Sequence, residues 1–375
     1  MHAGMFTAYS PDELSLGIRE QRSRFSPTLA IVFSSPSLDI GECVRVLAGS
    51  GCAVFGASTA GEILTGAGAS PVYEQSATCC LIDPDPSVLA VRLFPRKGAT
   101  PFELGEEAGR WAAGCFAQPA LIVAVSGLTN NAEAIIRGME RYLPPGTVIA
   151  GGVAADDTAF LETMVFTEKS LTSDGIVVLA LDTARVSLAS FTTSGWTGIG
   201  VEMTVQSSEE NIVRQIDGKK PLDLVSEYLN ISREVVVSTA LSFPMLVRRP
   251  DGSEVLRTAL SADYKTGALI YAGSVPEGSK IRFSSSFGIE TIEKTVRELI
   301  AYYEKNPEAD LVLLFDCVAR HQAAGAQVDD EISAISDLWK VPVIGFFSYG
   351  EIGHAPAGKC DLFNETLSLA LLKFR

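Results

Sequence analysis

Two loops that carry a glutamate in the same setting are the most informative chemical feature of the sequence. Residues 56–63 read GASTAGEI and residues 345–352 read GFFSYGEI, so both contain the pattern G-x4-G-E-I. Backbone N–H groups, the hydroxyls of Ser58, Thr59 and Ser348, and the carboxylates of Glu62 and Glu351 could hold a polar ligand. The alternative is that the glycines only permit tight turns and the glutamates cap helices or pair with arginines. Because the same acid occupies the same loop position twice, we expect Glu62 or Glu351 to receive a ligand ammonium group.

Arg320 is a further candidate for ligand contact, because it follows Asp316-Cys317 just past the end of an expected strand. Its planar guanidinium could hold a ligand carboxylate through two hydrogen bonds. The alternative is an internal salt bridge to Glu351 or Asp316, since many loop arginines pair within their own protein. The sequence leaves both interpretations open.

Three histidines limit the choice of a haem ligand. His2 lies at the N-terminus, whereas His321 neighbours Arg320 and His354 follows Glu351 by three residues. Either of the last two could ligate haem iron, and the lack of a C-x-x-C-H sequence means that such a haem would be bound noncovalently. A single loop histidine is usually a polar surface residue, so we expect no cofactor and keep haem as the alternative.

Catalysis is not expected from the residues present. Cys317 and His321 could be drawn as nucleophile and base, but no residue that would orient the base is identifiable, and a cysteine at a strand end is commonly a small buried hydrophobe. The sequence has no G-x-S-x-G, H-E-x-x-H or paired C-x-x-C motif. We therefore predict a receptor rather than an enzyme, without a metal site.

A repeat that occurs three times must position these loops. Each copy begins with an apolar strand, continues with an amphipathic helix and ends with a second strand that closes on Gly56, Gly151 or Gly345. A further helix precedes each copy, and capping sequences at Ser10-Pro11 and Thr100-Pro101 mark the first two. A third apolar strand follows each copy. The opening strands are predicted at 29–33, 121–125 and 311–315, and the third strands at 77–82, 175–181 and 367–372.

The segment between the second and third copies has a different pattern. Residues 185–287 show short alternating strands, interrupted by one helix at 221–229. The polar stretch at 217–220 is interpreted as a boundary. It divides the chain into an N-terminal domain of two units, residues 1–220, and a C-terminal domain with the third unit, residues 221–375.

The repeat predicts an α/β fold of layered mixed sheets with helices on the outer faces, built from three α-β-α-β-β units across two domains. Ligands of such sheets gather beyond the carboxyl ends of the strands. The loops after the opening strands and after the three closing glycines are therefore the expected site.

Composition excludes several partners. The 375 residues carry 30 Lys and Arg against 45 Asp and Glu, a formal charge of −15, which repels nucleic acid and anionic lipid. The longest apolar runs have the length of a strand rather than of a membrane span, and the first residues lack the features of a secretory signal. We expect a cytoplasmic protein that binds neither nucleic acid nor membrane.

The two loops resemble the two halves of the FIST family of intracellular signal-transduction sensors, in which a GxSTAGEI-like motif lies early and a GFxxYGEI-like motif lies late. Further segments match the family in the family's order, and the resemblance covers roughly residues 25–355. They are Gly151-Gly152-Val-Ala-Ala-Asp156, residues 211–218, Phe243-Pro-Met, Asp316-Cys317-Val-Ala-Arg320 and Tyr349-Gly350-Glu351. An N-terminal and a C-terminal FIST domain are thus implied.

The resemblance implies a receptor module for a small, amino-acid-like ligand that signals to a separate protein such as a histidine kinase. The ligand-binding set that it implies combines the loop residues with the matched segments, namely Ser58, Thr59, Gly61, Glu62, Gly152, Asp156, Cys317, Arg320, Tyr349, Gly350 and Glu351. A haem-binding nitric oxide sensor with a partner histidine kinase, using His321 or His354, is the first alternative. A scaffold that binds only protein is the second.

Overall fold

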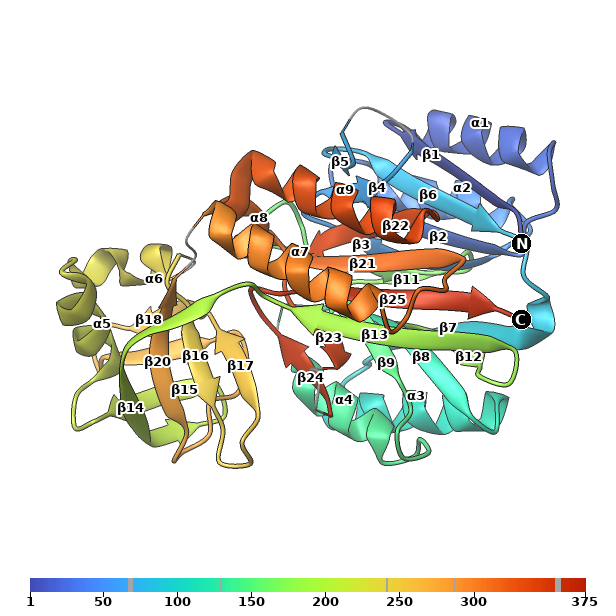
Figure 1. Ribbon diagram of the computed structural model, residues 1–375. Coiled ribbons are helices and arrows are strands. Elements are labelled where there is room, and N and C mark those ends of the chain that lie inside the picture. Colours follow the sequence, from blue (N-terminus) through green and yellow to red (C-terminus); the bar gives the residue numbers. More distant parts are fainter. Residues whose placement is uncertain (67–69, 129, 241, 286–287, 355–358) are drawn as a thin grey trace.

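A computed structural model describes residues 1–66, 70–128, 130–240, 242–285, 288–354 and 359–375. The chain forms a core of three six-stranded sheets and a smaller lobe with a seven-stranded sheet, which lies at the left in Figure 1. The mixed α/β class predicted from the sequence is confirmed. No helix in the described residues is long and apolar enough to cross a membrane.

The first two units of the core have the same order of helices and strands. The first contains β1 (Ala3–Ala8), α1 (Pro11–Arg22), β2 (Leu29–Ser34), α2 (Ile40–Ala48), β3 (Ala53–Ser58), β4 (Glu62–Leu64), β5 (Val72–Tyr73) and β6 (Ala77–Ile82). The second contains β7 (Leu89–Pro95), α3 (Pro101–Cys115), β8 (Pro119–Ser126), α4 (Ala132–Glu140), β9 (Ile149–Val153), β10 (Val165–Phe166), β11 (Leu171–Thr172) and β12 (Gly175–Asp182).

The third unit follows the same plan, but the lobe is inserted after its first strand. Its elements are β13 (Val186–Thr193), α7 (Ile289–Tyr303), β21 (Leu311–Cys317), α8 (Val318–Ala324), α9 (Val328–Trp339), β22 (Val343–Ser348), β23 (Glu351–His354), β24 (Cys360–Phe363) and β25 (Leu367–Phe374). Each unit thus contains the predicted α-β-α-β-β succession, together with a leading strand and a hairpin that the sequence did not indicate.

The three core sheets have equivalent strand orders. They run β1-β6-β2-β3-β10-β11, β7-β12-β8-β9-β23-β24 and β13-β25-β21-β22-β4-β5. In each, the opening and closing strands are parallel, and Gly56, Gly151 and Gly345 pair with Val32, Val123 and Leu314 of the opening strands. The three closing glycines therefore occupy matching positions, as predicted from the repeat.

The units exchange their hairpins in a ring. The hairpin β4-β5 of the first unit extends the sheet of the third beside β22, and β23-β24 of the third unit extends the sheet of the second beside β9. The hairpin β10-β11 of the second unit extends the sheet of the first beside β3. This exchange joins all three units into one body and brings loops far apart in the sequence together.

Close approach of strands explains two of the closing glycines. A Cβ atom at Gly345 would lie 2.0 Å from the carbonyl oxygen of Leu314, and one at Gly151 would lie 1.8 Å from that of Val123. No side chain fits at these distances. The helix starts are also capped locally, since the side chains of Ser10, Thr100 and Asn131 accept hydrogen bonds from the first turns of α1, α3 and α4.

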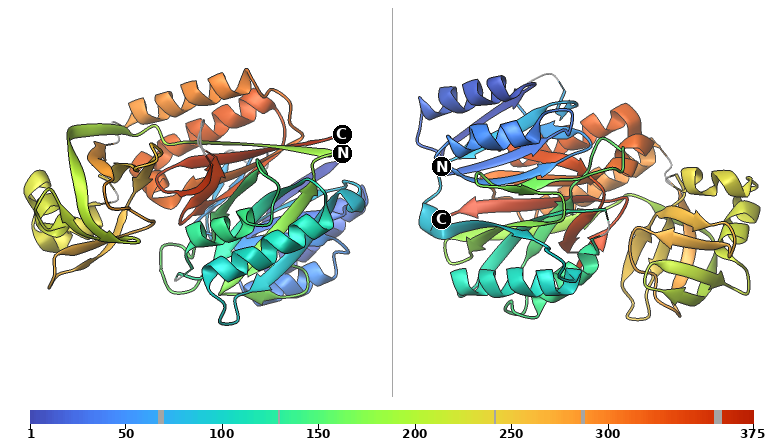
Figure 2. Two further views of the ribbon diagram at one scale, coloured as in Figure 1. Left: turned by 90° about the horizontal axis from the view of Figure 1, so that it is seen from below. Right: turned by 180° about the vertical axis from the view of Figure 1, so that it is seen from behind.

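The core is layered as predicted. Apolar side chains from the inner faces of the three sheets, among them Phe33, Ile122 and Phe346, meet in one central cluster. The helices cover the outer faces, where α1 and α2, α3 and α4, and α7 and α9 each pack on their own sheet (Figures 1 and 2). Two-sided burial of the sheets explains why their strands read as continuous apolar runs.

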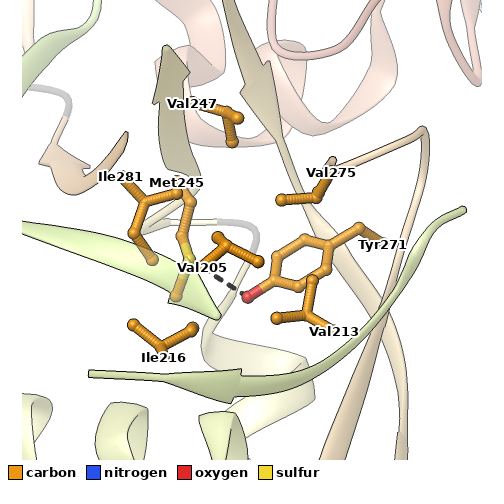
Figure 3. A pocket seen from close by; sticks show the side chains of 8 residues that line it. All are labelled: Val205, Val213, Ile216, Met245, Val247, Tyr271, Val275 and Ile281. Atoms are coloured by element: carbon orange, nitrogen blue, oxygen red, sulfur yellow. Dashed lines mark hydrogen bonds between the residues drawn. The ribbon is translucent and has the colours of Figure 1, made fainter. Parts of the chain in front are cut away.

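The lobe spans residues 197–285 and forms an antiparallel sheet in the order β17-β16-β20-β14-β15-β19-β18. It contains β14 (Thr197–Glu209), β15 (Ile212–Ile216), α5 (Pro221–Leu229), α6 (Val236–Thr239), β16 (Met245–Arg248), β17 (Glu254–Arg257), β18 (Ala259–Asp263), β19 (Ala268–Tyr271) and β20 (Lys280–Ser285). Its interior is apolar, and the Tyr271 hydroxyl donates to Met245 Sδ at 3.1 Å (Figure 3).

The division proposed at residue 220 falls inside this lobe, between β15 and α5. The leading strand of the third unit, β13, lies before that point and pairs with β25 at the end of the chain. Local composition changes at 217–220, but long-range strand pairing assigns β13 to the third unit.

Candidate functional site

The loops after β3, β9 and β22 interlock through backbone hydrogen bonds. Each loop bonds to the other two, through Ala155 N to Ser58 O at 3.0 Å, Val153 N to Gly350 O at 2.8 Å, and Ala60 N to Phe347 O at 3.0 Å. The hairpin exchange makes this possible, since it places each loop beside two other units. Nine of the predicted site residues lie on this ring of loops: Ser58, Thr59, Gly61, Glu62, Gly152, Asp156, Tyr349, Gly350 and Glu351.

Glu62 is fully buried at the start of β4. One carboxyl oxygen accepts from the Thr59 hydroxyl, and the other accepts from the Ser76 hydroxyl at 2.6 Å and from the Ser76 N–H at 3.2 Å. Burial raises the pKa of Glu62 to about 8. Burial therefore favours the neutral form near pH 7, and Thr59 and Ser76 hold the carboxyl group in place.

Glu351 has the same environment at the start of β23. The Ser348 hydroxyl donates to one carboxyl oxygen at 2.6 Å, and the Thr366 hydroxyl donates to the other at 2.7 Å. Burial raises the pKa of Glu351 well above its ordinary value. The G-x4-G-E-I motif thus builds two matching carboxyl sites in which a neighbouring Ser or Thr occupies every carboxyl oxygen.

The second unit lacks this arrangement. Val165 pairs with Ala57 on β3, in the register that Glu62 and Glu351 have on β22 and β9. Val165 follows Gly151 by 14 residues, whereas Glu62 follows Gly56 by six. The longer loop contains Asp156, whose carboxylate accepts from the backbone N–H groups of Phe160, Leu161 and Glu162 and from the Tyr349 hydroxyl.

The other predicted residues of the ring also have internal contacts. The Ser58 hydroxyl donates to Ala155 O at 2.7 Å and accepts from Met164 N at 2.8 Å. A Cβ atom would come within 3.0 to 3.2 Å of a neighbouring side chain at Gly61, Gly152 and Gly350. These contacts account for the loop geometry, and they leave the predicted role of the ring in ligand binding as a prediction.

We predict that Glu62→Gln flattens the pH dependence of stability. In the wild type, the unfolded chain loses the Glu62 proton near the ordinary pKa of 4.5, whereas the folded protein keeps it until about pH 8. The free energy of unfolding must therefore fall as pH rises between these values. The difference in stability, variant minus wild type, should rise from pH 4.5 to 8 and stay constant outside this range. Chemical denaturation at several pH values measures it, and a constant difference across the range would contradict the prediction.

Arg320 is not part of the ring; it lies on α8, and its side chain bonds to residues of α7 and α9. Its guanidinium donates two hydrogen bonds to Glu331, one at 2.5 Å, and a longer one of 3.4 Å to Asp316. All three side chains are buried. Of the internal partners considered from the sequence, Asp316 is present and Glu351 is not. Glu331, the main partner, was missed because it is brought in by the packing of α9.

Several buried polar atoms near Arg320 have no hydrogen-bond partner among the described residues. They are Asp316 Oδ2, Glu365 Oε2 and the indole Nε1 of Trp196. Trp196 and Arg320 line a small hollow at the N-terminus of α7, where the chain enters the lobe. The other oxygen of Glu365 accepts from the Thr258 hydroxyl of the lobe at 2.8 Å. This junction of core and lobe, which we call the junction site, thus has acceptors and a donor that no group of the described residues uses.

Cys317 and the histidines have ordinary surroundings. Burial raises the pKa of the Cys317 thiol well above its usual value, which is the opposite of what an activated cysteine requires. The His321 ring stacks on Phe347 with 4.0 Å between centroids, and burial lowers its pKa. His354 Nε2 accepts from the backbone N–H of Ile149 at 3.3 Å. His321 thus lies on helix α8, whereas His354 lies at the end of β23 in the sheet of the second unit.

Comparison with known protein families decides the relationship. A model of the FIST N domain matches residues 28–219, and one of the FIST C domain matches residues 221–354. The chain belongs to the FIST family. The two domain models meet inside the lobe, and the FIST N match runs from β2 of the first unit through the second unit to β15 of the lobe, so it includes the leading strand β13 of the third unit.

Similar proteins occur in mycobacteria. An uncharacterized protein of Mycobacterium tuberculosis is 28% identical over 247 residues, which cover 60% of this chain and 61% of that protein. An uncharacterized protein of Mycobacterium bovis is 28% identical over 244 residues with the same coverage. The match thus spans about three fifths of the length of these relatives.

Proposed function

We propose that this FIST protein is a sensory receptor, not an enzyme, that binds a small amino-acid-like molecule and signals to a separate protein, such as a histidine kinase, in the cytoplasm. Membership of the FIST family supports a sensory role. The observation that carries the proposal is the junction site, where two buried carboxyl oxygens and one indole N–H have no hydrogen-bond partner among the residues that the structure describes. Unused buried polar groups are costly, and a ligand with both an amino and a carboxyl group would satisfy them.

The position of the junction site suggests how binding is transmitted. Trp196 and Arg320 belong to the core side of the junction, while Thr258 lies between β17 and β18 of the lobe. A ligand held between them contacts both parts and so favours one arrangement of the lobe over others. The signal to a partner protein would be this change in lobe position.

The proposal is tested by thermal melting of the purified protein with each of the twenty standard amino acids, followed by calorimetric titration of those that raise Tm. Binding to the native state must raise stability. Trp196→Phe, which removes only the indole N–H and some ring area, should weaken binding of the identified amino acid by about tenfold through loss of a hydrogen bond to its carboxylate. Trp111→Phe on α3, far from the junction, is the matched control and should bind normally.

Two other outcomes would replace the proposal. A Soret absorbance band in the purified protein, lost in His321→Ala or His354→Ala, would establish the haem sensor instead. If no amino acid and no haem raises Tm or binds by calorimetry, the receptor proposal is wrong and a scaffold that binds only protein becomes the better account.

A further inference from the structure

The junction site and the adjoining ring loop with Glu351 together contain more buried acid than base. Asp316, Glu331, Glu351 and Glu365 are all fully buried, and the buried cation among them is Arg320. Arg320 gives its two best hydrogen bonds to Glu331, and neighbouring hydroxyls occupy both oxygens of Glu351. Asp316 and Glu365 are left, and each has one oxygen without a partner in the described part of the chain.

We propose that Asp316 and Glu365 form an ammonium site that takes the protonated primary amine of the ligand. This inference rests on the proposed function and names the group that the receptor recognises. It is distinct from the prediction that Glu62 or Glu351 receives an ammonium group, since hydroxyls already donate to the oxygens of those two side chains.

Strand pairing brings the backbones of Asp316 and Glu365 close together. Asp316 near the end of β21 pairs with Leu367 of β25, and the N–H of Cys317 donates to Thr366 O at 3.0 Å. Glu365 directly precedes Thr366 in the turn before β25. The two side chains are close enough for the charge of one to raise the pKa of the other.

In the free protein, protons rather than a bound cation neutralise the carboxylates of Asp316 and Glu365. Burial raises the pKa of Asp316 to about 7 and that of Glu365 to about 8, so one or both are protonated near neutral pH. A buried carboxylate needs a counter-charge or a proton. An incoming ammonium can replace the proton and donate to the two unused oxygens.

The donor set favours an organic ammonium over a metal ion. Within the described residues, no group of three or more His, Cys, Asp or Glu side chains is arranged to hold a metal. Two carboxyl oxygens are too few for Ca²⁺ or Zn²⁺ but match two of the three N–H donors of a primary ammonium.

A comparison of Glu365 with Gln75, which occupies the matching turn of the first unit, shows that the backbone of this turn does not require a buried acid. Gln75 occupies the turn before β6 that matches the position of Glu365 before β25, and both have left-handed backbone, with φ of 52° and 56°. Gln75 is exposed, whereas Glu365 is fully buried and bonded to Thr258 of the lobe. The turn itself therefore does not require a buried acid, and the lobe creates the environment of Glu365.

The test compares Asp316→Asn and Glu365→Gln with the wild type, and uses Gln75→Glu as the control at the matching turn. The probes are the amino acid that raises Tm most, the amine left when its carboxylate is removed, and the acid left when its amine is removed. Both junction variants should bind the amino acid at least tenfold more weakly, while Gln75→Glu should bind as the wild type does. The wild type should bind the amine more tightly than the deaminated acid. Melts without ligand check the folding of each variant.

The outcomes separate this inference from the proposed function. If an amino acid binds, but both folded variants bind it as the wild type does, or the deaminated acid binds the wild type as tightly, the receptor stands and the ammonium site is wrong. If no amino acid binds, putrescine and ethanolamine are titrated instead. Stabilisation of the wild type by either amine, lost in the two variants, supports the ammonium site alone, and no stabilisation overturns it.

Discussion

Arg320→Met is expected to lower the free energy of unfolding by about 3 to 5 kcal/mol, the usual cost of removing one partner from a buried ion pair. Glu331 accepts two hydrogen bonds from this guanidinium, and Asp316 accepts a third. All three groups are buried, so removal of the cation leaves carboxylates that must take up protons or remain unpaired. Urea denaturation of the wild type and the variant measures the effect.

Two further variants show whether the ion pair is the cause. Arg297→Ala removes an exposed partner of Glu293 on α7, separated by 3.8 Å, and should change stability by less than about 1 kcal/mol. The double variant Arg320→Met with Glu331→Leu should regain much of the loss, because apolar pairs can replace buried ion pairs. A loss below about 1 kcal/mol in Arg320→Met itself would show that the arginine is not held as the structure describes.

This expectation also bears on ligand studies. Replacement of Arg320 by alanine looks from the sequence like a direct test of carboxylate binding. In the structure it would disturb the fold, so weaker binding would not reveal a ligand contact. For this reason the binding tests use Trp196→Phe, Asp316→Asn and Glu365→Gln, which remove single groups and keep the shape of the side chain similar.

Arg257→Met is expected to release the lobe from the core. Arg257 is fully buried on β17 and donates to Glu133 at the start of α4 at 2.6 Å and to Leu362 O on β24 at 3.1 Å. Glu133 also accepts from Arg249 at 2.8 Å and from Ser274 N at 2.9 Å. Burial alone would raise the pKa of Glu133, but Arg257, Ser274 and Arg249 outweigh it and hold the pKa below its usual value.

Loss of this contact should cost about 3 to 5 kcal/mol of docking, because the carboxylate stays buried with only part of its charge balanced. Hydrogen exchange should speed up in β17 and β24 and at the start of α4, while the exchange of the central strands β8 and β21 stays slow. Arg248→Ala, on the neighbouring strand β16, removes an exposed partner of Glu254 at 3.0 Å and serves as the control. Equal exchange in Arg257→Met and the wild type would contradict this role of the ion pair.

Much of the core could be predicted from local patterns. The helix at 221–229 and the strand at 77–82 have the predicted bounds, and the opening strands differ by at most two residues at an end. Very short strands were harder to predict from the sequence. The hairpins β4-β5 and β10-β11 include strands of two residues, which carry no periodic signal, and they exist because a neighbouring unit offers a free sheet edge.

The residues of the candidate site likewise divide into some that the sequence indicated and others that it did not. The repeated G-x4-G-E-I loops indicated that Glu62 and Glu351 have one role, and the structure confirms that their surroundings match. Their partners Ser76 and Thr366 stand 14 and 15 residues further along, at no spacing that a sequence pattern marks. Glu365 and Trp196 were missed for the same reason, since nothing in their immediate neighbours shows that both are buried beside Arg320.

The sequence by itself determined the α/β class, the three units, the positions of the closing glycines and the family. These features follow from apolar periodicity and from short motifs, which act between residues close in the chain. Only the tertiary structure decided which unit receives each hairpin, that the lobe interrupts the third unit, and which acids at the junction keep one oxygen without a partner among the described residues. Those features depend on contacts between residues more than a hundred positions apart, such as Arg257 with Glu133 and Thr258 with Glu365. Glu365, whose pKa burial raises to about 8, thus accepts a hydrogen bond from a residue of the lobe that stands 107 positions earlier in the chain.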